Sequence, residues 1–401
     1  MSNRVTVTQH TPGYTLAGLV LLSLNLRPAA SAVGPLLGGI QQDLGLSDVG
    51  AGLLTALPAL CFAAFGALAP QVSNRLGPHR TIVAAITAMV LGQAARTVVD
   101  SAVLFLLATI VALAGMATAN VLLPSLVRRH FPQRVGFVTA LYSTGLNLGT
   151  ALAAMFSAPL ATWLGSWRHA LWAWVLMTVL TYVPWLPLLR HDRGHRPESG
   201  GGTVTMTDIA RTRLGWYLAL FFGFQSTQAY AVFGWLATIY VDAGAGVEFA
   251  GWMVGICTGL SIPLAYVVPT HVARSRRPAV LLVIMCAVGA SGYAALIIAP
   301  MAAPWLWACL VAVGLSGFPF FLAILAKRGR TSAGTAALSA FSQSVGYLIA
   351  AAGPLLIGVL RQVTGGFTAP LLLLIVILVP LTIFGALSSR PRYIEDELPQ
   401  R

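Results

Sequence analysis

Apolar segments long enough to cross a lipid bilayer recur along the whole chain, and they leave little sequence for a water-soluble fold. Hydrophobic residues make up 57% of the chain and charged residues 9%, whereas about 25% of the residues in an ordinary soluble domain are charged. A spanning helix needs about 20 predominantly apolar residues. Such segments occur at 14–38, 48–72, 81–99, 102–127, 136–161, 168–189, 214–240, 248–270, 279–299, 304–326, 334–360 and 367–388. We therefore predict an all-α integral membrane protein with twelve transmembrane helices.

Basic residues are concentrated on one side of these spans. Most of the 24 lysines and arginines lie near the termini or in alternate connecting segments, such as 75–80, 128–134, 274–277 and 327–330. The opposite segments carry Asp43, Asp48, Asp100, Asp242 and Glu248. Because lysine and arginine collect in cytoplasmic loops, both termini are predicted to be cytoplasmic. The net charge of +13 then reflects topology and contact with anionic membrane lipid, and we expect no nucleic-acid partner.

The second half of the chain repeats landmarks of the first half at a constant offset of 199 residues, which aligns Asp43 with Asp242 and Arg75 with Arg274. This register matches residues from both sides of the membrane at once. It predicts two pseudo-symmetric six-helix halves in the same orientation. The predicted organisation is an N-terminal half at 1–189, a cytoplasmic linker at 190–213, a C-terminal half at 214–390 and a cytoplasmic tail at 391–401.

Short polar and aromatic motifs recur in the predicted helices. They are Asn25-Leu26-Arg27-Pro28 in helix 1, Ala119-Asn120-Val121-Leu122-Leu123-Pro124 in helix 4, Ala140-Leu141-Tyr142-Ser143 in helix 5, Trp167-Arg168 before helix 6, and Gln225-Ser226 to Trp235-Leu236 in helix 7. In this order the chain resembles one bacterial branch of the major facilitator superfamily, the cyanate and nitroimidazole transporter family. The resemblance implies a multi-pass protein of the bacterial cytoplasmic membrane that moves small polar or anionic solutes, such as cyanate or nitro-heterocycles.

The connection between helices 2 and 3 contains Arg75, Gly77 and Arg80, and Arg274 occupies the place of Arg75 in the second half. This connection resembles the signature loop of the superfamily, which implies a role in the conformational change. The acidic residue of that signature is missing here. We therefore expect Arg75 to bind helix-terminus carbonyls in place of the usual charge latch between the halves.

Arg27 is the leading candidate for solute binding, because it lies inside the first span and no Asp or Glu lies inside any span beyond its first residue. An ionised guanidinium at bilayer depth costs about 3 kcal/mol or more, so it marks a substrate or ion pathway. Its five fixed donors fit planar or oxyanionic groups. We predict that Arg27 anchors an anionic or electron-rich solute. The alternative is that it caps backbone carbonyls opened by Pro28.

The resemblance implies that helices 1, 4, 7 and 10, with parts of 2, 5, 8 and 11, line a central cavity, and their polar residues are further candidates. Asn25 and Asn120 are expected either to orient a ligand or to bond to a neighbouring helix. Tyr142 and Asn147 lie five residues apart in helix 5. Only one of them is expected to point fully inward, and Tyr142 is favoured.

Helix 7 supplies four more candidates. Gln225 and Gln228 share one helix face, and at least one is expected to face the cavity because an amide is costly against lipid. Tyr230 and Trp235 are expected to form either an aromatic lid or part of an interfacial belt.

Helix 11 supplies Gln343 and Tyr347, an i, i+4 pair that faces one direction.

Two further arginines are assigned structural roles. Arg96 is expected to reach the headgroups or to pair with Asp100, and Arg361 is expected to be a boundary residue.

The chain lacks the parts of an enzyme or a primary pump. It contains no HExxH, GxSxG or P-loop motif, so we expect no catalytic activity, no metal and no cofactor. The histidines lie in connecting segments or at the outer start of helix 6, so no titratable carrier of protons is expected within the spans. We predict a monomeric secondary transporter that works by alternating access, through facilitated diffusion or exchange of a small molecule. The alternatives are a drug exporter of the same fold and a membrane sensor that does not transport.

Overall fold

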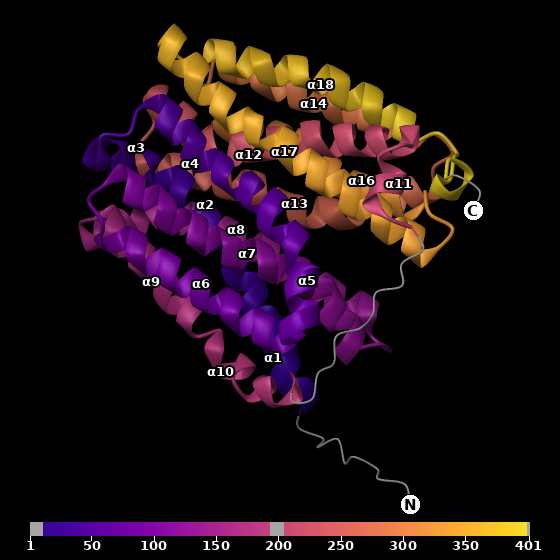
Figure 1. The fold of residues 1–401 in the computed structure, drawn as a ribbon. Coiled ribbons are helices and arrows are strands. Elements are labelled where there is room, and N and C mark those ends of the chain that lie inside the picture. Colours follow the sequence, from indigo (N-terminus) through magenta and orange to yellow (C-terminus); the bar gives the residue numbers. More distant parts are fainter. Residues whose placement is uncertain (1–10, 193–203, 399–401) are drawn as a thin grey trace, which may run out of the picture.

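The computed structural model describes residues 11–192 and 204–398, and the secondary structure of these residues is entirely helical (Figure 1). The N-terminal half contains α1 (Thr11–Leu26), α2 (Pro28–Ser31), α3 (Val33–Leu44), α4 (Asp48–Cys61), η1 (Phe62–Gly66), α5 (Ala67–Leu76), α6 (Pro78–Val98), α7 (Ala102–His130), α8 (Val135–Leu164), α9 (Trp167–Val179), α10 (Tyr182–Trp185) and η2 (Pro187–Asp192). The C-terminal half contains α11 (Met206–Ile209), α12 (Arg213–Asp242), α13 (Val247–Arg274), α14 (Pro278–Ile298), α15 (Pro304–Leu315), α16 (Gly317–Ala326), α17 (Ser332–Thr364), α18 (Thr368–Ser388) and η3 (Ile394–Asp396). Residues 193–203 of the predicted linker lie outside the described residues.

Helices correspond to all twelve predicted spans, and several spans consist of more than one helix. The first span is divided into α1, α2 and α3, where Pro28 begins α2. The second span is divided by the π-helical turn η1, which follows Pro58. A proline without an N–H and a π turn both interrupt the regular hydrogen-bond ladder, so each gives a span a local bend.

Nine helical runs within the described residues are long and apolar enough to cross a membrane by composition alone. The other three spans contain α8, α9 and α12. α9 is short because the helix breaks near Thr181, and α8 and α12 carry the polar side chains that line the central cavity.

Local sequence signals set the ends of the long helices. The side chains of Ser47, Thr212 and Thr331 accept backbone N–H groups at the starts of α4, α12 and α17. Gly45, with φ of +63°, ends α3 in the left-handed conformation that favours glycine. These signals place the turns at the two ends of the bundle.

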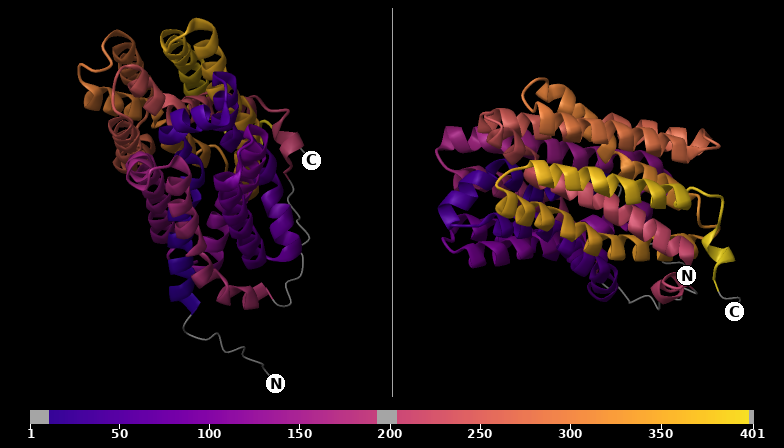
Figure 2. Two further views of the ribbon diagram at one scale, coloured as in Figure 1. Left: turned by 90° about the vertical axis from the view of Figure 1, so that its left-hand side faces the viewer. Right: turned by 90° about the horizontal axis from the view of Figure 1, so that it is seen from above.

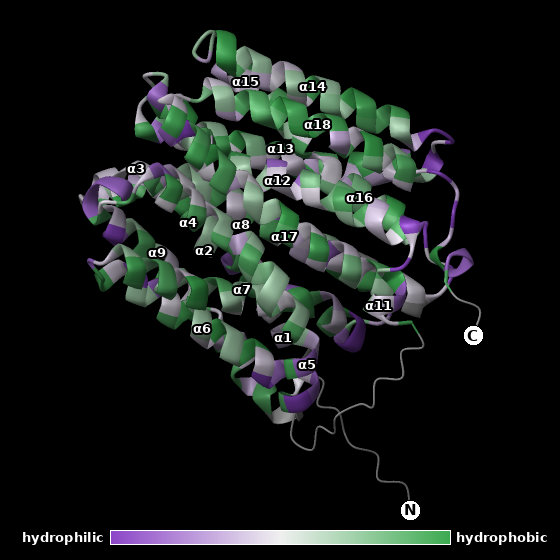
Figure 3. Cartoon of the chain, turned by 45° about the horizontal axis from the view of Figure 1, so that its top comes forward, coloured by the Kyte–Doolittle hydropathy of each residue, from purple (hydrophilic) through white to green (hydrophobic). Residues whose placement is uncertain are grey.

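The two ends of the bundle differ in charge. We call the end with the loops at 75–80, 128–134, 274–277 and 327–330 the basic end, and the end with Asp43, Asp48 and Asp242 the acidic end. Hydrophilic residues gather at these ends, whereas the helices between them are mostly hydrophobic (Figure 3). Lipid around the middle of the bundle explains this distribution.

The two halves pack against each other toward the acidic end, and their helices separate toward the basic end (Figures 1 and 2). The contacts between the halves join α4 to α17, α3 to α12 and α8 to α13. At Gly34 of α3 an added Cβ would lie 2.4 Å from the carbonyl oxygen of Phe233, so only glycine permits this approach. The central opening between the halves therefore lies toward the basic end.

Arg361 lies at the span boundary, as expected, but it is not a plain boundary residue, because it joins the halves at the acidic end. Its Nη1 lies 3.0 Å from Oδ1 of Asp48 in the opposite half, and its Nη2 lies 3.6 Å from Oδ1 of Asp242. The guanidinium also packs over the rings of Trp235 and Phe367. Arg361 thus links the two halves through partly buried ion pairs.

The described part of the tail, residues 391–398, packs against the basic end of the C-terminal half. The Glu395 carboxylate accepts the backbone N–H groups of Arg330 and Thr331, and Glu397 accepts the N–H of Leu214. The N–H of Ile394, whose side chain is buried, donates to the carbonyl of Arg328. The tail therefore caps the starts of α12 and α17.

Glu395→Gln is expected to lower the unfolding free energy by about 1 kcal/mol at neutral pH, because a charged cap of α17 is lost. Partial burial raises the pKa of Glu395. The hydrogen bonds from Arg330 and Thr331 together lower this pKa by more than burial raises it, so the pKa lies below its ordinary value. The stabilisation is fully present when the pH lies above the ordinary pKa of a glutamate. It is lost as the pH falls through the lowered pKa of Glu395 in the folded protein. Thermal unfolding of both proteins at pH 7 and at pH 3 measures this. If the stability difference between the wild type and Glu395→Gln grows on acidification, the assignment is contradicted. The control is Glu248→Gln, which changes an exposed glutamate.

Asp48→Asn is expected to loosen the acidic end, because it removes the ion pair that joins the halves. A partly buried pair of this kind is worth about 1 kcal/mol, so the closed population should fall about fivefold relative to the open one. Distances between spin labels at Val103→Cys and Met301→Cys, one in each half, measure the opening. Asp100→Asn is the control, since Asp100 pairs with Arg168 inside the N-terminal half. An unchanged distance distribution in Asp48→Asn would refute the role of the pair.

Candidate solute-binding cavity

A cavity of about 560 Å³ lies between the halves. It reaches from Arg27 and Thr150 to Thr139 and Pro269, which lie within about two turns of the basic ends of α8 and α13. This volume is within the roughly 300–1,000 Å³ of typical small-molecule sites. Of the described residues that line it, only Arg27 carries a formal charge. The cavity therefore suits a small polar or anionic molecule.

Arg27 occupies the break between α1 and α2, and the backbone of this bend is satisfied locally. The carbonyl of Arg27 accepts the N–H groups of Ala30 and Ser31 and the hydroxyl of Ser31. Among the described residues, the guanidinium of Arg27 has no backbone carbonyl partner, which leaves the carbonyl-capping alternative without support. The side chain lines both the large cavity and a small one of about 40 Å³ on the side of the acidic end.

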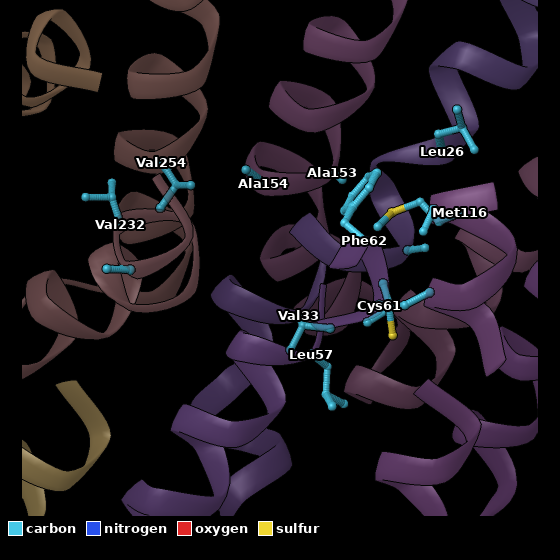
Figure 4. Packing of buried hydrophobic residues seen from close by; sticks show 14 of the residues in the cluster. Leu26, Val33, Leu57, Cys61, Phe62, Met116, Ala153, Ala154, Val232 and Val254 are labelled. Atoms are coloured by element: carbon cyan, nitrogen blue, oxygen red, sulfur yellow. The ribbon is translucent and has the colours of Figure 1, made fainter. Parts of the chain in front are cut away.

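Aromatic side chains from both halves surround the guanidinium. Its Cζ lies 5.8 Å from the ring centre of Phe62, in η1 of the N-terminal half. The Phe62 ring stacks on Tyr347 of α17 at 4.9 Å with an interplanar angle of 19°. The side chains of Tyr230 and Tyr347 also lie close enough to the Arg27 guanidinium to interact with its charge. Figure 4 shows Phe62 beside Met116 and Ala153, which belong to the same buried hydrophobic cluster.

Five candidates from the sequence line the cavity, namely Arg27, Asn147, Gln225, Tyr230 and Tyr347. In helix 5 it is Asn147, and not the favoured Tyr142, that reaches the cavity. Tyr142 instead packs against the hydrophobic core. Asn147 lies one turn from Ser143, so these two share the inner face of α8.

Six candidates lie outside the lining. Asn25 donates to the carbonyl of Leu21 at 2.8 Å within its own helix, and Gln343 donates to Ser339 at 2.7 Å. Asn120 lies half-buried in α7. Like Tyr142, it does not line the cavity.

Gln228 and Trp235 bind backbone within the C-terminal half. Gln228 donates to the carbonyl of Leu374 at 2.6 Å and accepts the hydroxyl of Tyr293. Trp235 donates to the carbonyl of Pro354 at 3.2 Å. Polar groups in membrane helices commonly find such partners, and this is what the sequence alone does not reveal.

Several hydroxyl residues line the cavity without having been predicted. They are Thr139, Ser143, Thr144, Thr150, Ser226, Thr258, Ser261, Tyr266 and Ser316. On α8 the positions 139, 143, 147 and 150 follow the spacing of one helix face. That spacing was the signal in the sequence that identifies this wall.

The four predicted loop residues lie at the basic end. Gly77, with φ of +94°, separates α5 from α6, while Arg75, Arg80 and Arg274 are exposed. In the C-terminal half the last carbonyls of α13, those of Val272 and Ala273, accept Nζ of Lys327. A basic side chain therefore caps the end of α13. That side chain is Lys327, from the loop before α17, and not Arg274, which occupies the place of Arg75 in the second half.

Arg96 is buried, so its expected placement near the headgroups or Asp100 is wrong. Its side chain is fully enclosed between helices, and its Nη1 donates to the carbonyl of Ala29 at 2.8 Å. Asp100 pairs with Arg168 instead.

Comparison with known proteins agrees with this geometry. The family model described as Major Facilitator Superfamily matches residues 19–354. The 2-nitroimidazole transporter of Escherichia coli (strain K12) is 34% identical over 94% of this chain and 96% of its own length. The cyanate transport protein CynX of the same organism is 27% identical over 87% and 90%. A solved bacterial homologue of the human lysosomal transporter Spinster, in an inward-facing and occupied conformation, has a TM-score of 0.73 at 15% identity and covers 97% of this chain and 99% of its own.

The family match and the relatives indicate a membrane transporter, not an enzyme, and a two-part helical bundle around a central cavity fits this class. The chain belongs to the major facilitator superfamily, and its relatives include cyanate and nitroimidazole transporters.

A cysteine at Asn147 is expected to react with a membrane-impermeant methanethiosulfonate added on the side of the basic end, because this partly exposed position lines the opening. Mass spectrometry of vesicles labelled from one side measures this, in a Cys257→Ser background because Cys257 also lines the cavity. Gln228→Cys is the buried control. Equal labelling at positions 147 and 228 would contradict the described lining.

Proposed function

We propose that this protein moves a small anion or planar polar solute, such as cyanate or a nitroimidazole, across the bacterial cytoplasmic membrane. The observation that carries the proposal is the single uncompensated guanidinium in the cavity. No carboxylate lines the cavity in the described residues, so no acidic side chain there competes with a ligand for Arg27. Oxygen-rich or anionic groups supply the acceptors that a guanidinium fork needs.

The aromatic wall supports a planar solute. Tyr230 and Tyr347 line the cavity and place ring surfaces and hydroxyl groups next to the cation. A heterocycle can stack on such rings while its nitro oxygens accept from Arg27. Asn147 and Gln225 add amide groups on opposite walls, which can orient the rest of the molecule. The names of the relatives, a 2-nitroimidazole transporter and a cyanate transport protein, agree with this chemistry.

Alternating access follows from the arrangement of the halves. Arg27 lies at the boundary between the large cavity and the small one, and it meets residues of both halves. Rocking of the halves would separate Asp48 from Arg361 and close the basic end around the solute. Because basic loops are cytoplasmic, we place the basic end and both termini in the cytoplasm. Both halves belong to one chain, so a monomer provides the whole pathway.

The cavity lining argues against proton coupling through a carboxylate or a histidine, because neither lines it in the described residues. We therefore propose facilitated diffusion or exchange. A drug exporter would rely on apolar contacts and would depend little on Arg27. A sensor would bind the solute without moving it.

Arg27→Ala is expected to reduce uptake of cyanate and 2-nitroimidazole into proteoliposomes at least tenfold, because the anchoring charge is lost. In the wild type, a ligand at 100 times its Kd stabilises the protein by about 2.7 kcal/mol, and this shift should vanish in the variant. Thermal unfolding with and without 2-nitroimidazole measures it.

The exposed Arg390→Ala is the control and should transport as the wild type does. Transport that survives in Arg27→Ala would favour a drug exporter, and binding without flux in the wild type would favour a sensor. Wild-type flux that collapses when the proton gradient is dissipated would contradict diffusion or exchange.

A further inference from the structure

Arg96 is a fully buried guanidinium that the transport path does not use. It lies on α6, does not line the large cavity, and is completely inaccessible. Its Nε and Nη2 atoms are buried without a hydrogen-bond partner in the described residues. Burial of an ionised group is unfavourable unless its donors are satisfied. Tight packing alone therefore gives no reason for an arginine here, since an apolar side chain of similar volume would avoid that cost.

The one hydrogen bond of Arg96 reaches the bend that carries Arg27. Its Nη1 donates to the carbonyl of Ala29, two residues after Arg27. In a continuous helix this carbonyl would accept from the N–H of residue 33. The helix is interrupted at Ala32, between α2 and α3. Arg96 thus satisfies a carbonyl at the interruption.

The bend has two faces. On one face Ala29 receives the Arg96 guanidinium, and on the other Arg27 enters the large cavity. Gln93, one turn before Arg96, donates to the hydroxyl of Thr178 on α9. α6 is therefore fastened to α9, and from that support Arg96 reaches α2.

We propose that Arg96 is a positioning residue that holds the bend of the first span through the Ala29 carbonyl and so fixes the direction of Arg27 in the cavity. This rests on the proposed function, in which Arg27 anchors the solute. Loss of the hydrogen bond lets the bend relax and spreads the orientations of Arg27. Solute affinity falls, whereas the rocking of the halves, which depends on other contacts, continues.

The test compares Arg96→Met with Arg96→Lys. Methionine fills similar volume but donates no hydrogen bond, whereas lysine keeps a donor for the Ala29 carbonyl. Arg96→Met is expected to raise the KM for 2-nitroimidazole uptake about tenfold while the maximal rate stays within twofold, and Arg96→Lys is expected to recover most of the affinity. Thr87→Val, which removes the hydrogen bond that Tyr182 donates to α6 and leaves Gln93, Arg96 and Ala29 untouched, is the control and should keep KM within twofold.

Hydrogen exchange without ligand gives an independent measurement. In Arg96→Met, amides of residues 29–33 should exchange at least tenfold faster than in the wild type, while those of residues 224–232 in α12 stay unchanged. Wild-type exchange over 29–33, or a KM that stays at the wild-type value, in folded Arg96→Met would overturn the inference. If Arg27→Ala binds 2-nitroimidazole as the wild type does, the proposed function fails instead, whatever the exchange shows.

Discussion

Arg27 carries its positive charge at a place where neither lipid nor a carboxylate compensates it, and the rest of the structure is arranged around that fact. The residue stands at an interruption of the first span, so its side chain leaves the helix where two halves meet. The cavity beside it is lined by hydroxyl and amide groups that can hold water or solute. A cation in such a place is tolerable because it faces a cavity with hydroxyl and amide groups and not acyl chains. A bound anion or electron-rich group then completes the site.

The internal repeat places corresponding aspartates at the same end of the two halves, but the ion pairs that these aspartates form are not at corresponding positions. Asp43 and Asp242 correspond at the acidic end, yet they bind different partners. Asp43 pairs with Arg168 inside the N-terminal half, at 2.9 Å. Asp242 meets Arg361, which also reaches Asp48 across the interface. Both aspartates therefore pair with an arginine of their own half, but only Arg361, the partner of Asp242, also reaches across to the opposite half.

The fold was largely predictable because apolar length and loop charge are local properties of the sequence. The cavity was less predictable, because the direction of a polar side chain depends on what lies across from it. Gln225 and Gln228 share a helix face and both donate to backbone carbonyls, those of Leu315 and Leu374, but only Gln225 lines the cavity. The sequence assigns Trp235 and Tyr230 the same expected role. Only the structure distinguishes them, because the indole N–H of Trp235 donates to the carbonyl of Pro354. The roles of Arg96 and Arg361 needed the tertiary structure, since their partners lie far away in sequence.

The two arginines around the first span have complementary surroundings. A carbonyl left open at a helix break is a strong acceptor, and in a low-dielectric interior it attracts any nearby donor. The Ala29 carbonyl lies two residues from Arg27, and it would compete with a solute for the Arg27 donors if nothing else bound it. Arg96 occupies that carbonyl from the opposite face. The second buried cation therefore removes an internal competitor, and this explains how Arg27 can remain without a carbonyl partner next to an irregular backbone.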